Sequence, residues 1–459
     1  MILALLFVLA APVDWVPARW RWLETKTLEL LSGTPVNCLL IDWKPDQKGQ
    51  AAAFSAAAAG RGIAALAVIR PGGDAVEATR NAMSAKLAGV VLEGDFPNGI
   101  ADKIGDGVAG PVPVIELTSR SRMKLGGKST IIGTYQGVWP GIQLLEDGAA
   151  KAGPSGSPWI NTNAGFLRAA GAFGNNAIWI ANLPPPKTVI NPENYLQAIG
   201  DGAMVGARWV IALDDDFARR LLERDAAALK SWQRMTQLLK FYDGHREWRA
   251  YQPAGKLAVI QSAKDGALLS GGILDMIAAR HTPVRAVPPE QLKPEVLKGA
   301  TMAVDVDAAS LTAQEREVLK QFTRAGGTLL TAPPGWNQGT APKQDQITLD
   351  EKELKRLDDI WHDVQSMIGR SNLGARLFNV SSMLSNLLSS PDGKQVLIHL
   401  VNYANYPVES VTVHVLGDYK QAWLYTPEGT EKKLDVYKVD EGTGIDIAQV
   451  SVTAVLRLE

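Results

Sequence analysis

Short apolar runs recur eight times between residues 36 and 213, with helix-like stretches between them. Most of these runs are continuous rather than alternating in polarity, which is typical of strands buried on both faces in a parallel sheet covered by helices. Eight such units in series predict a closed (β/α)8 barrel. The runs are Val36–Trp43, Ile63–Ile69, Leu87–Glu93, Val112–Leu117, Ser129–Tyr135, Pro158–Asn161, Ala177–Asn182 and Ala207–Leu213.

The fifth and sixth runs, Ser129–Tyr135 and Pro158–Asn161, are short and have glycine or proline close by. If one of them is not a strand, an open doubly wound sheet also fits the pattern. Both architectures place the ends of the strands, and any polar side chain there, at one edge of the sheet.

A second α/β pattern follows the barrel after a linker at Tyr251–Gly255. It predicts a small open parallel sheet, with Thr312 and Glu315 forming a capping box at the start of one helix. The expected elements are strand Lys256–Gln261, a turn at Gly271-Gly272, helix Ile273–Arg280, strands Val284–Val287 and Thr301–Asp305, helix Thr312–Arg324 and strand Gly327–Ala332.

The last part of the chain changes to an antiparallel β pattern, in which Val411, Val413 and Val415 alternate with polar residues. We expect a β-sandwich with a hairpin turn at Asp392-Gly393. Its elements are helix Asp350–Ile368 and strands Gln395–Asn402, Ser410–Val415, Gln421–Tyr425 and Val450–Leu458. The predicted organisation is therefore a signal peptide (1–14), the barrel (15–250), the second α/β domain (255–340), and a linker helix with the sandwich (346–459).

The first residues contain an apolar run, Ile2–Ala11, that ends in small residues, as a signal peptide does. This predicts a secreted or periplasmic protein, and the alternative is a buried N-terminal strand. The run is too short to span a bilayer, so no stable membrane insertion is expected. The single cysteine, Cys38, excludes an internal disulfide, and the net charge of −1 argues against a nucleic-acid partner.

In a barrel of this kind the active site lies at the C-terminal ends of the strands. Carboxylates dominate those positions, and no histidine lies there, so no zinc set and no Ser–His–Asp triad is expected. No phosphate loop is present either, so we expect no metal and no cofactor. The catalytic candidates are Glu116, Asp42, Glu93 and Asp214, and the substrate-binding candidates are Asp95, Tyr135, Trp139, Asn161, Asn163, Asn182 and Asp215.

Paired carboxylates beside aromatic residues are what glycoside hydrolysis requires. Glu116 is the first choice for the acid because apolar residues and proline precede it, which favours partial desolvation. Asp42 adjoins Trp43, and Trp139 sits in a loop where it can stack on a sugar. Each carboxylate has an alternative role as a helix cap or an ion-pair partner, and one member of Asp214–Asp216 is expected to cap the next helix.

The order of these parts resembles the β-galactosidase-type glycoside hydrolases, which join a (β/α)8 barrel to an amidotransferase-like trimerisation domain and a C-terminal β-sandwich. The run Arg324–Leu329 (RAGGTL) is the most specific piece, and Val396–Tyr403 is similar to the terminal sandwich. The resemblance implies a carbohydrate substrate and a homotrimer. Glutamine hydrolysis is excluded in the second domain because it contains no cysteine nucleophile.

In that family the acid is a Glu preceded by Asn after the fourth strand, and the nucleophile is a Glu after the seventh. Here Ile115 precedes Glu116, and the seventh run ends Ala181-Asn182-Leu183 without a carboxylate. The sequence therefore leaves two main hypotheses: a glycoside hydrolase whose carboxylate pair lies on other strands, and a catalytically inactive carbohydrate-binding or scaffold relative. A barrel isomerase or aldolase would need a phosphate site or an active lysine at a strand end, and neither was found.

Overall fold

The structure is a computed structural model that describes residues 10–152, 158–261, 282–306, 308, 311–331, 351–429 and 431–459. The chain divides into two compact units. The first contains Met1–Gly137, Asn175–Tyr195 and Ala207–Asp243, and the second contains Val138–Gly174, Leu196–Gly206 and Gly244–Glu459. Most of the predicted signal peptide, the turn Gly271-Gly272 and the helix Ile273–Arg280 lie outside the described residues.

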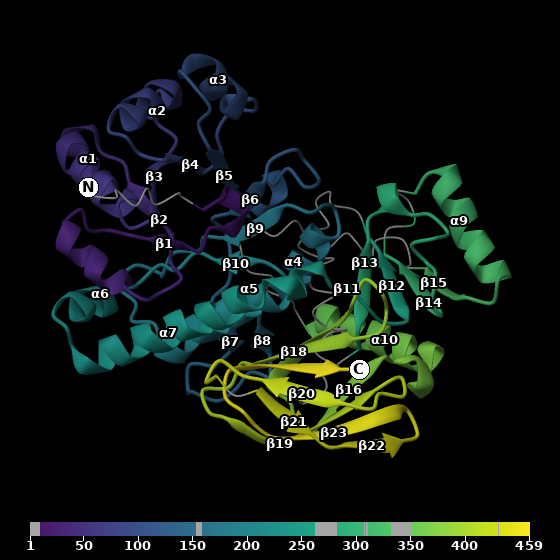
Figure 1. The fold of residues 1–459 in the computed structure, drawn as a ribbon. Coiled ribbons are helices and arrows are strands. Elements are labelled where there is room, and N and C mark those ends of the chain that lie inside the picture. Colours follow the sequence, from purple (N-terminus) through teal and green to yellow (C-terminus); the bar gives the residue numbers. More distant parts are fainter. Residues whose placement is uncertain are drawn as a thin grey trace, which may run out of the picture. The chain divides into compact units, whose positions relative to one another are not determined.

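The first unit is an eight-stranded, all-parallel α/β barrel, as predicted (Figure 1). An isolated parallel bridge between Ala18 and Ile211 joins the first strand to the segment after the last, which brings the ring close to closure. The strands, in their order around the sheet, are β1 (Pro17–Arg19), β2 (Cys38–Asp42), β3 (Ala64–Ile69), β4 (Gly89–Glu93), β5 (Val114–Thr118), β6 (Ile131–Thr134), β9 (Ala177–Ile180) and β10 (Arg208–Trp209).

One of the eight predicted barrel strands is wrong. Within Pro158–Asn161, only Ile160–Asn161 (β8) is a strand, and it pairs antiparallel with β7 (Gly141–Ile142) in the second unit. The eighth barrel strand is instead β1, which pairs parallel with β2 through Pro17, Ala18 and Arg19. A strand of three residues that ends in arginine produces no apolar run, so hydrophobic periodicity could not reveal it.

Helices cover the outer side of the barrel strands, and Figure 1 shows α1, α2 and α3 outside β2–β5. Asp74 caps α2 by accepting from the backbone N–H groups of Val76 and Glu77. Residues 215–244 form two helices, because Arg224 adopts a left-handed conformation (φ 60°) between them. The helices are α1 (Lys48–Ala59), α2 (Ala75–Ser84), α3 (Ile100–Gly107), α5 (Pro192–Met204), α6 (Asp215–Leu222) and α7 (Ala226–Gly244), and α5 continues into the second unit.

The barrel interior is filled by every second residue of each strand. Leu40, Leu66, Val91 and Leu117 belong to this core, together with the fully buried Trp179. Because successive side chains of a strand point to opposite faces, this set fixes which residues face inward along each strand. Gly133 of β6 leaves no room for a side chain, since a Cβ there would overlap Leu117 and lie 2.9 Å from the backbone oxygen of Trp179.

The second unit contains a four-stranded parallel sheet and a two-layered antiparallel arrangement. The parallel sheet has the order β13-β12-β14-β15, and the capping box of Thr312 and Glu315 begins α9 as predicted. Its elements are β12 (Leu257–Ile260), β13 (Val284–Val287), β14 (Met302–Asp305), α9 (Ala313–Arg324) and β15 (Thr328–Thr331), with α4 (Ala164–Gly171) and α10 (Glu351–Ile368) elsewhere in the unit.

Two antiparallel sheets share one apolar core in the C-terminal part of the chain (yellow and green in Figure 1). The predicted hairpin turn at Asp392-Gly393 joins β17 to β18, and Gly393 has φ 71°. One sheet contains β11 (Gln252–Pro253), β17 (Met383–Ser389), β18 (Val396–Asn402), β24 (Thr453–Leu458), β20 (Ala422–Tyr425) and β21 (Glu431–Leu434). The other contains β16 (Ala375–Phe378), β19 (Val408–Val415), β23 (Gly442–Val450) and β22 (Val436–Val439).

His399, at the centre of β18, lies on the face of its sheet opposite the shared core. It is 3% exposed, and its ring meets Trp248 edge-on at 5.6 Å between ring centroids. Burial, and to a smaller extent the nearby His245, lower the pKa of His399 to about 4. The native protein therefore keeps this imidazole neutral at a pH where the unfolded chain would protonate it.

We expect Gly133→Ala to destabilise the protein by about 1–3 kcal/mol, because the added methyl group overpacks the barrel interior. Gly105→Ala in α3 is the matched control, since a Cβ there meets nothing within 4 Å and alanine favours the helix. Urea unfolding of both variants measures the difference. Equal stability of the two would contradict this description of the barrel core.

Acid should weaken the native state through His399. Between pH of about 6.5 and 4, this histidine is protonated in the unfolded chain and neutral in the native protein. The free energy of unfolding therefore falls as the pH is lowered through that range, by on the order of 3 kcal/mol in total. His399→Leu should remove this part of the pH dependence, whereas His362→Leu at an exposed position should keep it. Urea unfolding at pH 7 and near pH 4 tests this, and parallel curves for wild type and His399→Leu would refute it.

Candidate functional site at the barrel mouth

Two of the predicted carboxylates meet at the C-terminal ends of the barrel strands. Asp42 is the last residue of β2 and Glu93 is the last residue of β4. Asp42 shares the inward-facing register of Cys38 and Leu40, and Glu93 shares that of Val91. Both side chains therefore belong to the interior face of the barrel at its mouth.

Arg70, which directly follows β3, links the two carboxylates. Its Nη2 lies 2.9 Å from Oδ1 of Asp42 and 2.8 Å from Oε2 of Glu93. Burial alone would lower the pKa of Arg70, but the charges of Glu93 and Asp42 and their hydrogen bonds outweigh that effect and raise it. The guanidinium is therefore a permanent cation between two acids.

Glu93 has a second cationic partner, Arg19, the last residue of β1. The Nη2 group of Arg19 donates to Glu93 and also to the backbone oxygen of Ala181, at 3.1 Å from the latter. The side chains of Arg19 and Glu93 are only 10% and 7% exposed, whereas those of Arg70 and Asp42 are 46% and 59% exposed. The mouth thus has a buried ion pair below and a solvent-facing ion pair above.

Glu116, the first choice for the acid, lies in the middle of β5 and faces the outside of the barrel. It pairs in register with Leu92, whereas the inward-facing Glu93 pairs with Leu117. Its carboxylate is 2.7 Å from Nζ of Lys124. The register therefore separates Glu116 from Glu93 and Asp42 by the thickness of the barrel wall.

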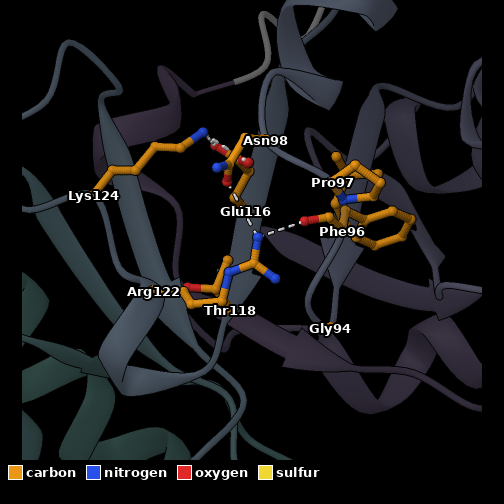
Figure 2. A pocket seen from close by; sticks show the side chains of 9 residues that line it. Gly94, Phe96, Pro97, Asn98, Glu116, Thr118, Arg122 and Lys124 are labelled. Atoms are coloured by element: carbon orange, nitrogen blue, oxygen red, sulfur yellow. Dashed lines mark hydrogen bonds and ion pairs between the residues drawn. The ribbon is translucent and has the colours of Figure 1, made fainter.

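Figure 2 shows the outer pocket in which Glu116 lies, with Lys124 pointing toward it. Arg122 donates from Nη2 to the backbone oxygen of Phe96 at 2.7 Å and to Oδ1 of Asn98 at 3.2 Å. These contacts tie the segment after β5 to the segment after β4. Lys124 and Arg122 both bond residues that line this small pocket. The contacts therefore stabilise the loops after β4 and β5.

Two further candidates act as backbone anchors in the first unit. Asp214 is 3% exposed and caps α6 by accepting from the backbone N–H of Phe217 at 2.9 Å. It also accepts from the hydroxyl of Tyr195 at 2.8 Å. Asp95 accepts from the backbone N–H of Ser119 at 2.9 Å, which holds the loops after β4 and β5 together.

Three candidates follow barrel strands, two of them in loops and the third, Asp215, as the first residue of α6. Tyr135 directly follows β6 and is half-buried, with its backbone N–H donating to Thr118 at 3.3 Å. Asn182 follows β9 and is half-buried. Asp215 is 84% exposed and forms an ion pair with Arg21 at 2.6 Å.

Trp139, Asn161 and Asn163 belong to the second unit rather than to the barrel. Trp139 is half-buried, and Asn161 is the last residue of β8. Asn163 is 1% exposed, and its side chain donates to Asp201 at 3.0 Å and to the backbone oxygen of Val138 at 3.0 Å. It therefore has a structural role in the second unit.

Asp201 is a fully buried carboxylate that sequence reasoning did not single out. It accepts hydrogen bonds from Thr162, from the hydroxyl of Tyr403 at 2.5 Å, and from the backbone and side chain of Asn163. Burial raises the pKa of Asp201, and these hydrogen bonds partly offset the rise. The cluster joins α5, the segment before α4 and the end of β18 within the second unit.

Arg19 and Arg70 are the site residues that the sequence did not reveal. Our strand-end survey sought acids, and Arg19 belongs to the strand that hydrophobic periodicity missed. Arg70 follows the second apolar run at once, so a survey of cations at strand ends would have found it. Among the described residues no group of three or more His, Cys, Asp or Glu side chains is arranged to hold a metal ion.

The mouth therefore offers two carboxylates and two guanidinium groups to a ligand. Carboxylates bind sugar hydroxyls and stabilise positive charge at an anomeric carbon, and guanidinium groups bind oxygen atoms in a fixed planar geometry. Over the described part of the chain, no helix combines the length and apolar character that crossing a bilayer requires.

The barrel and the antiparallel sheets recur in a solved structure of a glycoside hydrolase. The chain is similar to α-L-fucosidase isoenzyme 2 from Paenibacillus thiaminolyticus, with a TM-score of 0.63 and 10% sequence identity over 97% of this chain and 99% of that chain. This likeness is one of fold.

Two weaker likenesses are to a rhamnosidase from Novosphingobium sp. PP1Y (TM-score 0.47, 13% identity, 92% of this chain and 44% of that chain) and to a β-galactosidase from Rahnella sp. R3 (TM-score 0.37, 9% identity, 90% and 67%). No protein-family model matches the sequence, and no curated protein matches it.

Arg19→Met should destabilise the protein by about 3 kcal/mol, because it removes one partner of a buried ion pair and leaves Glu93 with Arg70 alone. Arg21→Met is the control, since Arg21 pairs with the exposed Asp215 and such pairs contribute about 0–1 kcal/mol. Denaturant unfolding of the two variants compares them. A loss no larger for Arg19→Met than for Arg21→Met would contradict the buried role of the Arg19–Glu93 pair.

Proposed function

We propose that this protein is a carbohydrate-active enzyme of the glycoside hydrolase type, with Glu93 and Asp42 as its carboxylate pair. The observation that carries the proposal is the shared contact of both carboxylates with Nη2 of Arg70 at the C-terminal mouth of a parallel barrel. This is the place where barrel enzymes bind their substrates. The fold likeness to a fucosidase supports the same class.

The spacing of the two acids fits this chemistry. Two oxygen atoms that contact one nitrogen, at 2.9 and 2.8 Å, can be no farther apart than those distances laid end to end, which is about 6 Å. Retaining glycosidases hold their two carboxyl groups about 5–5.5 Å apart, and inverting ones about 6.5–9.5 Å. The pair at the mouth is therefore close enough for the retaining geometry.

The surroundings of the two acids differ, and we assign their roles from that difference. Glu93 is buried between the guanidinium groups of Arg19 and Arg70, which hold its carboxylate in place, so it suits the stabilisation of, or attack on, the positively charged anomeric carbon. The side chain of Asp42 is more than half exposed and accessible to water, so we assign it to proton transfer. A bound sugar would displace the solvent-facing contact between Arg70 and Asp42, because exposed ion pairs are weak.

We also infer that the protein is a divergent relative of the β-galactosidase-type superfamily and is secreted or periplasmic. The order of barrel, open sheet and antiparallel sheets supports the first inference, and the apolar run Ile2–Ala11 supports the second. Glu116 and Asp214, which sequence reasoning placed among the catalytic candidates, receive supporting roles in this proposal because of the partners described above.

One observation favours a second candidate function, carbohydrate binding without turnover. Arg19 and Arg70 both bond Glu93, so two cations already hold the buried carboxylate of the proposed pair. A carboxylate held in this way orients a sugar hydroxyl as well as it stabilises a transition state. In this second proposal the barrel binds a glycan and leaves its glycosidic bonds intact.

The test uses Glu93→Gln, which keeps the size of the side chain and removes its charge. With a panel of aryl glycosides that includes α-L-fucoside and β-D-galactoside, we expect kcat/KM to fall by about 10²–10³-fold, because the charge that stabilises the anomeric carbon is lost. Asp42→Asn should reduce kcat to a similar degree. The matched control is Glu116→Gln, whose carboxylate lies on the outer face and whose loss should leave kcat/KM nearly unchanged.

The outcomes separate the two candidates. Turnover by the wild type that survives Glu93→Gln but not Glu116→Gln would overturn the assignment of the pair. Saturable glycan binding with no turnover, weakened by Glu93→Gln, would select the binding function instead. If the wild type neither binds nor hydrolyses any glycoside of the panel, both candidate functions are excluded.

A further inference from the structure

Arg70 joins both acids of the barrel mouth through a single nitrogen atom. Its Nη2 contacts Oδ1 of Asp42 at 2.9 Å and Oε2 of Glu93 at 2.8 Å. A guanidinium group carries its N–H donors on three nitrogen atoms in one plane. The donors on Nη1 and Nε of Arg70 have no hydrogen-bond partner within the described part of the chain. Because the side chain is 46% exposed, a ligand can reach them.

The contact with Asp42 occupies only part of an edge of the guanidinium plane. Each edge that includes Nη2 pairs it with Nη1 or with Nε, and a planar carboxylate binds such an edge through two parallel N–H···O bonds. Asp42 accepts a single hydrogen bond there, through Oδ1. A ligand carboxylate that takes the whole edge would therefore make more hydrogen bonds with Arg70 than Asp42 does.

Glu93 would stay anchored during such an exchange. Arg19 donates to Oε2 of Glu93 from Nη1 at 3.3 Å and to Oε1 from Nη2, so this buried pair is bidentate. Asp42 is the more loosely held partner of Arg70, because exposed ion pairs are weak. The Arg70–Asp42 contact is thus the part of the network that a ligand can replace without leaving a buried charge unpaired.

The charges of the mouth network favour an anionic ligand. In the function proposed above, Asp42 transfers a proton, and an acid carries no charge before it donates its proton. The guanidinium groups of Arg19 and Arg70 then face one carboxylate, that of Glu93. This leaves one positive charge in surplus, and a ligand with one negative charge would balance it.

We propose that the substrate of this site is a glycoside of an acidic sugar, of the uronic acid class, whose carboxylate binds Arg70 in place of Asp42. This inference rests on the function proposed above and adds the substrate class. In such a sugar, the ring carbon that bears the carboxylate and the anomeric carbon are both bonded to the ring oxygen. A carboxylate held by Arg70 therefore brings the anomeric carbon close to Asp42 and Glu93, and Arg70 determines the specificity.

The experiment compares kcat/KM within matched pairs of aryl glycosides that differ only in the acid group. The pairs are glucuronide with glucoside and galacturonide with galactoside, each in its α and β forms. We expect the wild type to prefer the acidic member of at least one pair by about tenfold or more, because only that member makes the bidentate charge-assisted contact. The ratio within a pair is the readout, since a general loss of activity in a variant cancels from it.

Arg70→Met should abolish this preference, because it removes the guanidinium and keeps much of the length of the side chain. Arg70→Lys keeps the charge without the planar edge and should retain only part of the preference. The matched control is Arg61→Met. Arg61 is exposed and precedes β3, whereas Arg70 follows it, so this variant loses the same charge at the other end of the strand and should keep the preference.

The outcomes separate this inference from the hydrolase function itself. Equal hydrolysis of neutral and acidic members by the wild type overturns the inference and leaves the hydrolase function standing. A preference that persists in Arg70→Met, or that Arg61→Met reduces to the same degree, also overturns it.

If no glycoside is hydrolysed, the hydrolase function fails, and titration calorimetry with D-glucuronate, D-galacturonate and D-glucose decides on the inference. Binding of an acidic sugar that Arg70→Met removes and Arg61→Met keeps supports its recognition by Arg70. Binding that is absent, or that Arg70→Met leaves unchanged, overturns that recognition as well.

Discussion

The alternation of side chains along the barrel strands decides which acids of this protein can act together. Glu93 and Glu116 lie on neighbouring strands, Glu93 at the C-terminal end of β4 and Glu116 in the middle of β5. The register that pairs Leu92 with Glu116 turns one carboxylate inward and the other outward. A shift of β5 by one residue in that pairing would turn Glu116 inward, beside Glu93. Every role assigned at the mouth therefore depends on the β4–β5 register.

The same constraint explains why the mouth is rich in arginine. An inward-facing acid that is 7% exposed needs a charged partner or several hydrogen bonds, since desolvation of an isolated carboxylate is expensive. Glu93 obtains its partners from β1 and from the segment after β3, so the ion-pair network crosses the mouth between strands that are distant in sequence. The network thus fixes the positions of strand ends as well as neutralising charge.

Other buried carboxylates of the chain are satisfied differently, and the difference bears on chemistry. Asp214 and Asp201 accept hydrogen bonds from backbone N–H groups, hydroxyls and an amide, with no ion pair among the contacts described above. These two carboxylates therefore stabilise loops and helix ends. Glu93 is bonded instead by side chains that can move, and one of them, Arg70, is nearly half exposed. Its surroundings can therefore rearrange around a ligand without unfolding a helix terminus.

The sequence predicts the barrel because continuous apolar runs report strands buried on both faces, and seven of the eight runs are barrel strands. It misplaces one strand because Pro158–Asn161 pairs outside the barrel, whereas β1 is three residues long and carries the charged Arg19. The capping box of Thr312 and Glu315 is predicted correctly because a cap is a local interaction. Inward and outward orientation at strand ends depends instead on the register between strands, which apolar runs that do not alternate cannot define.

The sequence therefore predicts which kind of side chain forms the site, but it identifies only some of the residues. The residues at the strand ends are rich in carboxylates, and two of them, Asp42 and Glu93, share the contact with Arg70. Glu116 was chosen because apolar residues precede it, but apolar residues line both faces of a buried strand and do not show which way a side chain points. An inward-facing acid in a parallel barrel is better recognised by its position relative to the core residues two and four places before it. For Glu93 those residues are Val91 and Gly89, and for Asp42 they are Leu40 and Cys38, so the parity of the core extends to the mouth. The alternation of inward- and outward-facing residues thus connects the packing of the barrel interior to the side chains available at its mouth.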